Sequence, residues 1–229
     1  MHVSQPSGQY GRMKSALSAV IASAVLAASG SLAADAATDP LAYARAPFDA
    51  LRLSAELARE GRATSDPWAL VVAARLRKQV PTSEIARAPD GAKAAPAPTP
   101  DEVAAWLDQA ESLGGDDPRL AALVREVRET SFKGRAGGPQ VSKARVGPGA
   151  SHRYGERFEI GRPAVVYVEG DGDTDLLLRV VGPGGDTACA ENGPGDVKLC
   201  AWTALRTGSY AVEVLNRGRV DNAYAFATN

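Results

Sequence analysis

The chain has 229 residues, of which 45% are hydrophobic, and its formal net charge is −1 at pH 7. A chain of this length and hydrophobicity can bury a substantial core and can form one domain or two. The near-neutral charge gives no bulk electrostatic basis for binding nucleic acid, so no nucleic-acid partner is expected.

The first 36 residues have the order of features that is typical of an export signal. Basic residues precede an apolar run over residues 16–28, and small residues follow it. The run is shorter than the roughly 20 residues that a membrane span needs. We therefore expect a signal peptide at residues 1–36, translation from either Met1 or Met13, and a periplasmic or secreted protein without a membrane span.

Residues 39–130 have the composition of a small helical domain, because Ala, Leu, Arg and Glu are strong helix formers. Four helices are expected, two on each side of a Pro/Ala-rich loop at residues 81–100. Asp66-Pro67 and Asp117-Pro118 each combine a capping residue with proline at the first helical position. The sequence therefore predicts two helical hairpins.

The two hairpins form a weak internal repeat. It resembles a tetratricopeptide-type unit, which would imply a groove for peptides, but the aromatic and glycine positions typical of that unit are missing. Two hairpins also fall short of the three or more units that a solenoid usually needs. A small four-helix packing domain is the alternative.

Residues 131–150 are rich in glycine and in basic side chains, and they predict a linker. A basic linker either contacts anionic envelope polymers or is simply solvated.

Residues 151–229 contain short β-strand patterns separated by turns. Their regular spacing predicts an antiparallel, jelly-roll-like β-sandwich. The complete chain is thus expected to be α+β with two domains. The expected strands are Arg157–Ile160, Ala164–Glu169, Asp175–Val181, Thr187–Ala190, Val197–Thr203, Ser209–Asn216 and Tyr224–Thr228.

An acidic, glycine-spaced turn precedes one of these strands. Asp171, Asp173 and Asp175 place three carboxylates within five residues, where they repel one another. A calcium ion would relieve that repulsion, with further oxygens from Glu191, Asn192 or Asp196 of the neighbouring turn. The alternative is that the aspartates accept hydrogen bonds from backbone N–H groups. Calcium is the one cofactor that the sequence suggests.

The strand region resembles the bacterial pre-peptidase C-terminal domain, a β-sandwich found in many exported proteins. The resemblance covers roughly residues 151–229. It rests on the acidic turn at residues 170–176, Gly182-Pro183-Gly184-Gly185, Thr207-Gly208-Ser209-Tyr210 and the closing strand with Tyr224. Leu177 stands where the family usually has a carboxylate, which weakens a calcium site. The resemblance implies a non-catalytic accessory or binding module.

Cys189 and Cys200 are the only cysteines. An even pair in an exported chain favours a disulfide, and the turn between them predicts that it joins the two strands of one hairpin.

Candidates for catalysis are few. His152 is the only histidine after the signal segment. A metal site with two histidines therefore has too few of them, and a catalytic triad would have to use His152. Trp68 and Trp106 occupy apolar helical positions and are expected in a core. No catalytic residue is assigned.

The function expected from the sequence is that of an exported, non-enzymatic binding or accessory protein. Its sandwich would engage an envelope protein or a polysaccharide. Two alternatives remain: a calcium-stabilised structural domain, and a hydrolase that works through carboxylates alone.

Overall fold

The computed structural model describes residues 39–90, 101–130 and 138–229. The expected signal peptide, residues 91–100 of the Pro/Ala-rich loop and residues 131–137 of the expected linker lie outside the described residues. Pro40–Asn229 forms one compact unit. No helix in the described ranges is long and apolar enough to span a membrane.

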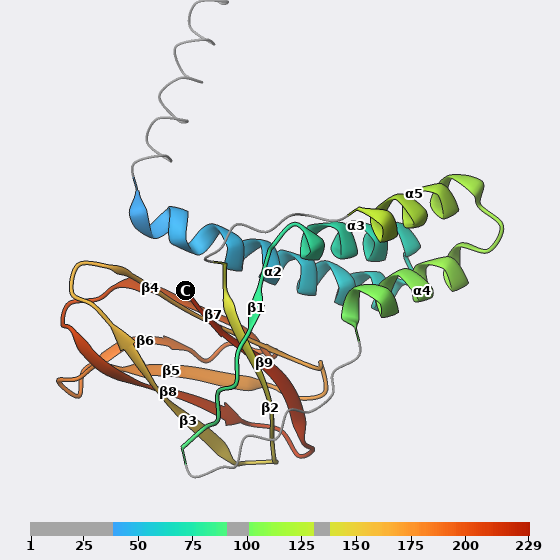
Figure 1. The fold of residues 1–229 in the computed structure, drawn as a ribbon. Helices are drawn as coiled ribbons and strands as arrows, with labels where there is room; N and C mark the ends of the chain where they lie inside the picture. The colour runs from blue at the N-terminus through green and yellow to red at the C-terminus, as the bar shows by residue number, and fades with distance from the viewer. Residues whose placement is uncertain (1–38, 91–100, 131–137) are drawn as a thin grey trace, which may run out of the picture. The chain divides into compact units, whose positions relative to one another are not determined.

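Four helices are described, and they lie where the sequence predicts them (Figure 1). They are α2 (Pro40–Thr64), α3 (Pro67–Lys78), α4 (Glu102–Gly114) and α5 (Pro118–Glu129). Asp66, Asp101 and Asp117 cap α3, α4 and α5 by accepting hydrogen bonds from backbone N–H groups in the first turn. The tetratricopeptide resemblance is not confirmed, because α2 packs against the β-sheet as well as against α3.

The described residues contain nine strands in two sheets that pack face to face. The five-stranded sheet has the order β1-β2-β9-β4-β7, and the four-stranded sheet has the order β3-β8-β5-β6. All pairs are antiparallel except β1 with β2. The strands are β1 (Ser83–Glu84), β2 (Gln140–Val146), β3 (Ser151–Phe158), β4 (Pro163–Gly170), β5 (Leu176–Val181), β6 (Thr187–Glu191), β7 (Val197–Thr203), β8 (Gly208–Asn216) and β9 (Asn222–Thr228).

The α+β fold class is confirmed, with helical hairpins preceding the strands and a β-sandwich core between the sheets. The sandwich begins earlier than the sequence predicts. Strand β2 lies within the expected linker and pairs with β9 along its full length, from Gln140↔Thr228 to Val146↔Asn222. Its inward side chains, which include Ser142 and Val146, alternate with outward Lys143 and Arg145. This alternation is difficult to detect in the sequence, because glycines flank the strand and two of its inward residues, Ser142 and Ala144, are small and weakly hydrophobic.

Helix α2 covers the outer face of the five-stranded sheet, where it contacts β4 and β7 (Figure 1). Phe48 and Leu51 of α2 pack with Val165, Tyr167 and Leu199 in an apolar cluster between the helix and the sheet. Residues 164–169 of β4 are therefore buried on both faces, by α2 on one side and by the four-stranded sheet on the other. This packing creates an interface between the helices and the sheet.

Candidate binding pocket between the helices and the sheet

Two of the three predicted calcium ligands, Asp171 and Asp175, accept hydrogen bonds from backbone N–H groups, whereas Asp173 donates its own N–H to Asp171. Asp171 accepts hydrogen bonds from the N–H of Asp173 at 3.3 Å and of Ala223 at 2.8 Å, and Asp175 accepts one from Gly195 at 2.6 Å. Within the described ranges, no group of three or more His, Cys, Asp or Glu side chains lies close enough together to hold a metal ion. The geometry thus matches the backbone-bonded alternative for this turn.

A guanidinium group supplies positive charge beside this turn. Arg59 of α2 lies with its Nη2 atom 2.5 Å from an oxygen of Asp196 and 3.1 Å from the carbonyl oxygen of Gly170. Asp196 is 1% exposed and also accepts a hydrogen bond from the N–H of Gly172 at 2.7 Å. A Cβ atom on Gly170 would collide with this carboxylate, so glycine is needed there. The acidic turn and its neighbour Asp196 therefore dock α2 onto the sandwich.

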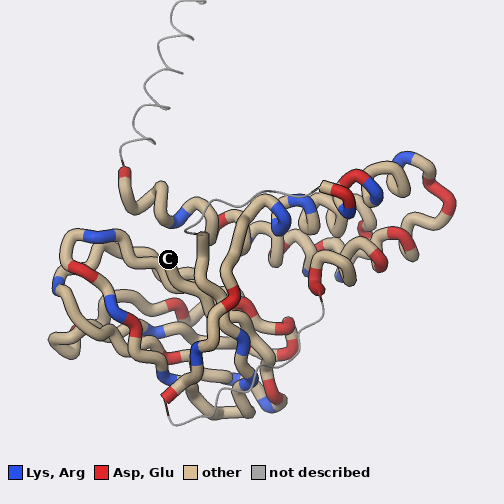
Figure 2. The backbone as a smooth tube through the Cα atoms, viewed as in Figure 1, with Lys and Arg blue, Asp and Glu red and all other residues tan. Residues whose placement is uncertain are grey.

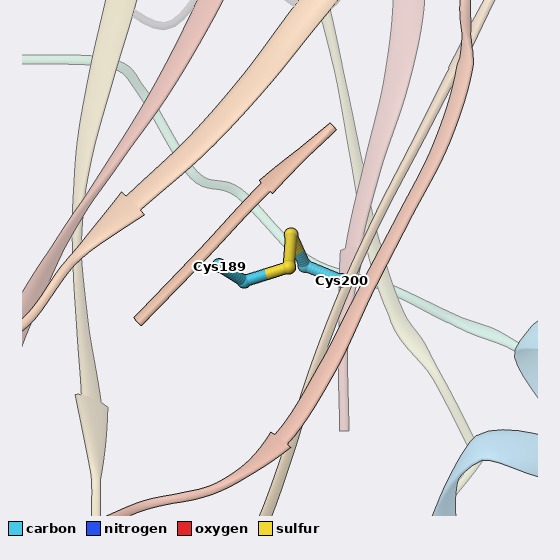
Figure 3. Close-up of a disulfide and its surroundings, with 2 residues drawn as sticks. All are labelled: Cys189 and Cys200. Carbon is cyan, nitrogen blue, oxygen red and sulfur yellow. A yellow bond between two sulfur atoms is a disulfide. The ribbon is translucent and has the colours of Figure 1, made fainter. Parts of the chain in front are cut away.

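The two cysteines form a disulfide with sulfur atoms 2.08 Å apart (Figure 3). The expectation that it joins two strands of one hairpin was wrong. Cys189 lies on β6 in the four-stranded sheet, whereas Cys200 lies on β7, which pairs with β4 in the other sheet. The turn between them carries the chain from one sheet to the other, and turn residues alone do not distinguish such a crossing from a hairpin. The bond therefore links the two layers of the sandwich.

Of the two tryptophans that the sequence predicts in a core, one is buried and the other is exposed. Trp106 is 4% exposed in the helical core, as expected, but Trp68 is 41% exposed because it lies in the first turn of α3. Trp202 packs against Phe158 and Tyr210.

His152 is half-buried and hydrogen-bonds through Nδ1 to the hydroxyl of Tyr224 at 2.7 Å. Burial lowers its pKa. That hydroxyl also bonds to the hydroxyl of Tyr154 at 2.6 Å, so the chain of three side chains ends in the sandwich core.

A pocket of about 390 Å³ lies between the helices and the outer face of the five-stranded sheet. We call it the interface pocket. Its apolar lining includes Leu51, Val80, Val103, Val141, Ala225 and Ala227. Its polar lining is Arg77, Thr82, Asp101, Glu102, Lys143, Tyr167 and Glu169. A smaller pocket of about 90 Å³ lies next to it and shares Glu102, Lys143, Glu169 and Ala225.

Arg77 organises the charges at the base of the interface pocket. Its Nη2 atom lies 2.7 and 2.9 Å from the two carboxylate oxygens of Glu169, and its Nη1 atom lies 3.3 Å from Glu102. Its Nε atom donates to the hydroxyl of Ser54 at 2.8 Å, and the guanidinium lies 5.1 Å from the centre of the Trp106 ring. Although burial alone would lower the pKa of Arg77, the charge of Glu169 and their hydrogen bonds raise it.

Both carboxylate oxygens of Glu169 accept hydrogen bonds from protein groups. It is 8% exposed, and besides Arg77 it accepts a hydrogen bond from the hydroxyl of Tyr167 at 2.6 Å. Burial, together with the charge of Glu169, raises the pKa of that tyrosine well above its ordinary value.

The Asp101 carboxylate is occupied by hydrogen bonds from the first turn of α4, so Glu102 and Lys143 are the charged side chains of the pocket that have fewer hydrogen-bond partners. Glu102 begins α4, and its side chain is 38% exposed. Burial raises the pKa of Glu102, and the charge of Glu169 adds to the rise, whereas Arg77 and Lys143 oppose it. Lys143 projects from the outer face of β2 and is half-buried. The pocket can therefore offer a ligand an apolar floor with one acidic and one basic group.

Sequence reasoning missed this pocket. Its residues come from α2, α3, α4, β2, β4 and β9, which meet only through long-range packing. One signal was present, because Glu169 ends a continuous apolar run at residues 164–168. A carboxylate at the end of a doubly buried strand needs a cationic partner.

No protein-family model matches the chain, and no curated protein matches it. The solved structures that are similar to part of it include the following three. The pre-peptidase C-terminal domain of a Bacillus anthracis collagenase is 13% identical, with 39% of this chain and 87% of that chain covered and a TM-score of 0.32. PliG of Aeromonas hydrophila, a periplasmic inhibitor of g-type lysozyme, is 15% identical over 43% and 93% of the two chains, with a TM-score of 0.31.

The Yersinia pseudotuberculosis-derived mitogen is 9% identical over 40% of this chain and 84% of that chain, with a TM-score of 0.32. Likenesses at these identities and TM-scores carry no inference about function.

Proposed function

We propose that this is an exported, non-enzymatic accessory protein that binds an extended segment of another protein in the interface pocket. The observation that carries the proposal is the lining of that pocket. Aliphatic side chains form its floor, and Glu102 and Lys143 add one charge of each sign. A peptide with an aliphatic side chain between acidic and basic ones complements all three features.

The lining favours a protein over a polysaccharide. Sugar rings usually stack on exposed aromatic faces. Among the described residues that line the pocket, Tyr167 is the one aromatic, and it is 1% exposed with its hydroxyl bonded to Glu169. The disulfide between Cys189 and Cys200 supports an oxidising compartment such as the periplasm or the exterior.

A carboxylate hydrolase is the second candidate, because Glu102 and Glu169 share the pocket and the pKa of Glu102 is raised, as a general acid requires. Against it, Arg77 contacts both carboxylates, and Glu169 has no free role as a base or a nucleophile.

The test uses the mature protein and a set of six-residue peptides composed of Leu, Lys and Glu. Amide NMR shifts during titration should be largest at Val80, Val103 and Val141, which line the pocket. Ala225→Leu fills the pocket and should abolish the shifts. Glu102→Gln and Lys143→Met should each weaken binding by about tenfold for peptides that carry the complementary charge.

Arg145→Met is the matched control for Lys143→Met, because it lies on the same face of β2 but outside the pocket lining. Peptide binding that Ala225→Leu leaves intact would contradict the proposal. Shifts at the pocket produced by oligosaccharides and not by peptides would reverse the choice of ligand. Cleavage of a glycoside or peptide that Glu102→Gln abolishes would favour the hydrolase.

A further inference from the structure

Two loops at one end of the sandwich direct aliphatic side chains into solvent. Ile160, between β3 and β4, is 64% exposed, and Leu205, between β7 and β8, is 77% exposed. Large aliphatic side chains at this exposure contribute little to folding stability, because most of their surface stays in water.

Hydrogen bonds join the two loops to each other. The N–H of Gly161 donates to the carbonyl oxygen of Ala204 at 2.8 Å, and the N–H of Ala204 donates to that of Arg162 at 3.0 Å. The N–H of Ile160 also donates to the hydroxyl of Thr207 at 2.9 Å. The backbone segments that carry the two aliphatic side chains thus lie side by side. We call this surface, with Ile160, Arg162, Leu205 and Arg206 at its tips, the loop end.

Basic side chains accompany these tips. Arg162 and Arg206 are exposed neighbours of Ile160 and Leu205, and Arg157 is exposed near the end of β3. Within the described parts of the chain, none of the three forms an ion pair. In these loops and the β5–β6 turn, Glu159 and Asp186 balance Arg162 and Arg206, and Arg157 of β3 adds one further positive charge; acidic and basic residues are interspersed at this end of the sandwich (Figure 2).

The first turn of α2 lies toward the same end. Phe48 packs on Tyr167 in the middle of β4, and Arg59 contacts Gly170 at its far end, so α2 runs in the same direction as β4. Its first turn is therefore directed toward Pro163, where β4 begins. Tyr43, in that turn, is 72% exposed.

We propose that the loop end binds the surface of an anionic lipid bilayer. Ile160 and Leu205 would enter the interface, the three arginines would contact headgroup phosphates, and Tyr43 would lie at the level of the headgroups, where tyrosine is favoured. Protruding aliphatic tips with basic neighbours fit a deformable lipid surface, whereas protein interfaces usually centre on a well-packed aromatic patch. With two aliphatic side chains and three cations, the attachment is weak, reversible and sensitive to salt.

The test is co-sedimentation of the mature protein with vesicles of phosphatidylglycerol and phosphatidylcholine at low salt. Ile160→Ser combined with Leu205→Ser should lower the partition coefficient roughly tenfold or more. Arg157→Gln with Arg162→Gln and Arg206→Gln should remove the preference for phosphatidylglycerol over phosphatidylcholine. Leu113→Ser and Val220→Ser, at side chains 41% and 53% exposed elsewhere, are the matched controls and should leave partitioning unchanged.

An unchanged melting temperature shows that each variant is folded. Failure of the native protein to sediment with either vesicle overturns the proposal, as does sedimentation that the Ile160/Leu205 variant retains. Sedimentation velocity without lipid provides a further check. A concentration-dependent dimer that the same double variant abolishes would assign the loop end to a second copy of the chain.

Discussion

The ion pair between Arg77 and Glu169 joins the helices to the sheet through two side chains that are 17% and 9% exposed. Removing one partner of such a pair leaves an uncompensated charge out of water. We expect Arg77→Met to lower the free energy of unfolding by about 3–5 kcal/mol in urea denaturation.

The double variant Arg77→Met/Glu169→Met should recover part of that loss, because no buried charge then remains. A double variant whose destabilisation equals the sum of the two single changes would show that the pair has no coupling energy.

The raised pKa of Glu102 leads us to expect that the stability of the protein depends on pH. The folded-state pKa of Glu102 is raised above the ordinary value of 4.5, so its contribution favours the folded state at low pH. That contribution is lost as pH rises from about 4 through the raised folded value. Glu102→Gln removes the titration, so its melting temperature relative to the native protein should increase over this window. Glu129→Gln, at an exposed position in α5, is the control. A difference in melting temperature between Glu102→Gln and the native protein that does not vary with pH would contradict the expectation.

The acidic turn leads to a prediction about calcium. Asp171 and Asp175 are bonded to backbone N–H groups, and Arg59 neutralises Asp196, so a cation has little left to bind. Calcium or EDTA should therefore leave the melting temperature unchanged, and calorimetry should detect no heat. Arg59→Met should lower stability, because Asp196 loses its cationic partner. If calcium restored the stability of the Arg59→Met variant, the turn would be able to bind a metal ion once the arginine is removed.

Among the elements, β6 and β7 are joined covalently, although they belong to different sheets. The disulfide closes a short loop, with a sequence separation of 11, and should stabilise the fold by about 2–3 kcal/mol. Cys189→Ala with Cys200→Ala should show this loss in urea denaturation. Reduction of the native protein should give a similar loss, and a reduced protein as stable as the oxidised one would contradict the expectation.

The helices and most strands were predictable because their signals are local. Asp-Pro pairs cap α3 and α5, and Tyr210, Val212 and Val214 alternate along β8 as a half-buried strand requires. Strand β2 was missed because its inward Ser142 and Ala144 give almost no hydrophobic signal. The partners of Glu169 were beyond prediction, since Arg77 is 92 residues away and their contact depends on how α3 packs over β4.

For the whole molecule, the helices and the sandwich should depend on each other for stability. The outer face of the five-stranded sheet presents Val165, Tyr167 and Leu199 to α2, and Glu169 to Arg77. A fragment of residues 138–229 would expose this apolar face to water with an unpaired carboxylate. We expect it to bind a hydrophobic dye and to melt well below the complete protein, and a fragment as stable as the complete protein would contradict this.

The position of β9 also determines when the fold can be completed. This strand, late in the sequence, lies between β2 and β4 at the centre of the five-stranded sheet. Until β9 is available, β1 with β2 and β4 with β7 are two separate pieces with unsatisfied edges, and contacts between distant segments form slowly. A chain that emerges gradually from its N-terminus therefore stays incompletely folded until residues 222–228 appear. For the export proposed above, this order of events would leave the five-stranded sheet open during translocation and closed only afterwards.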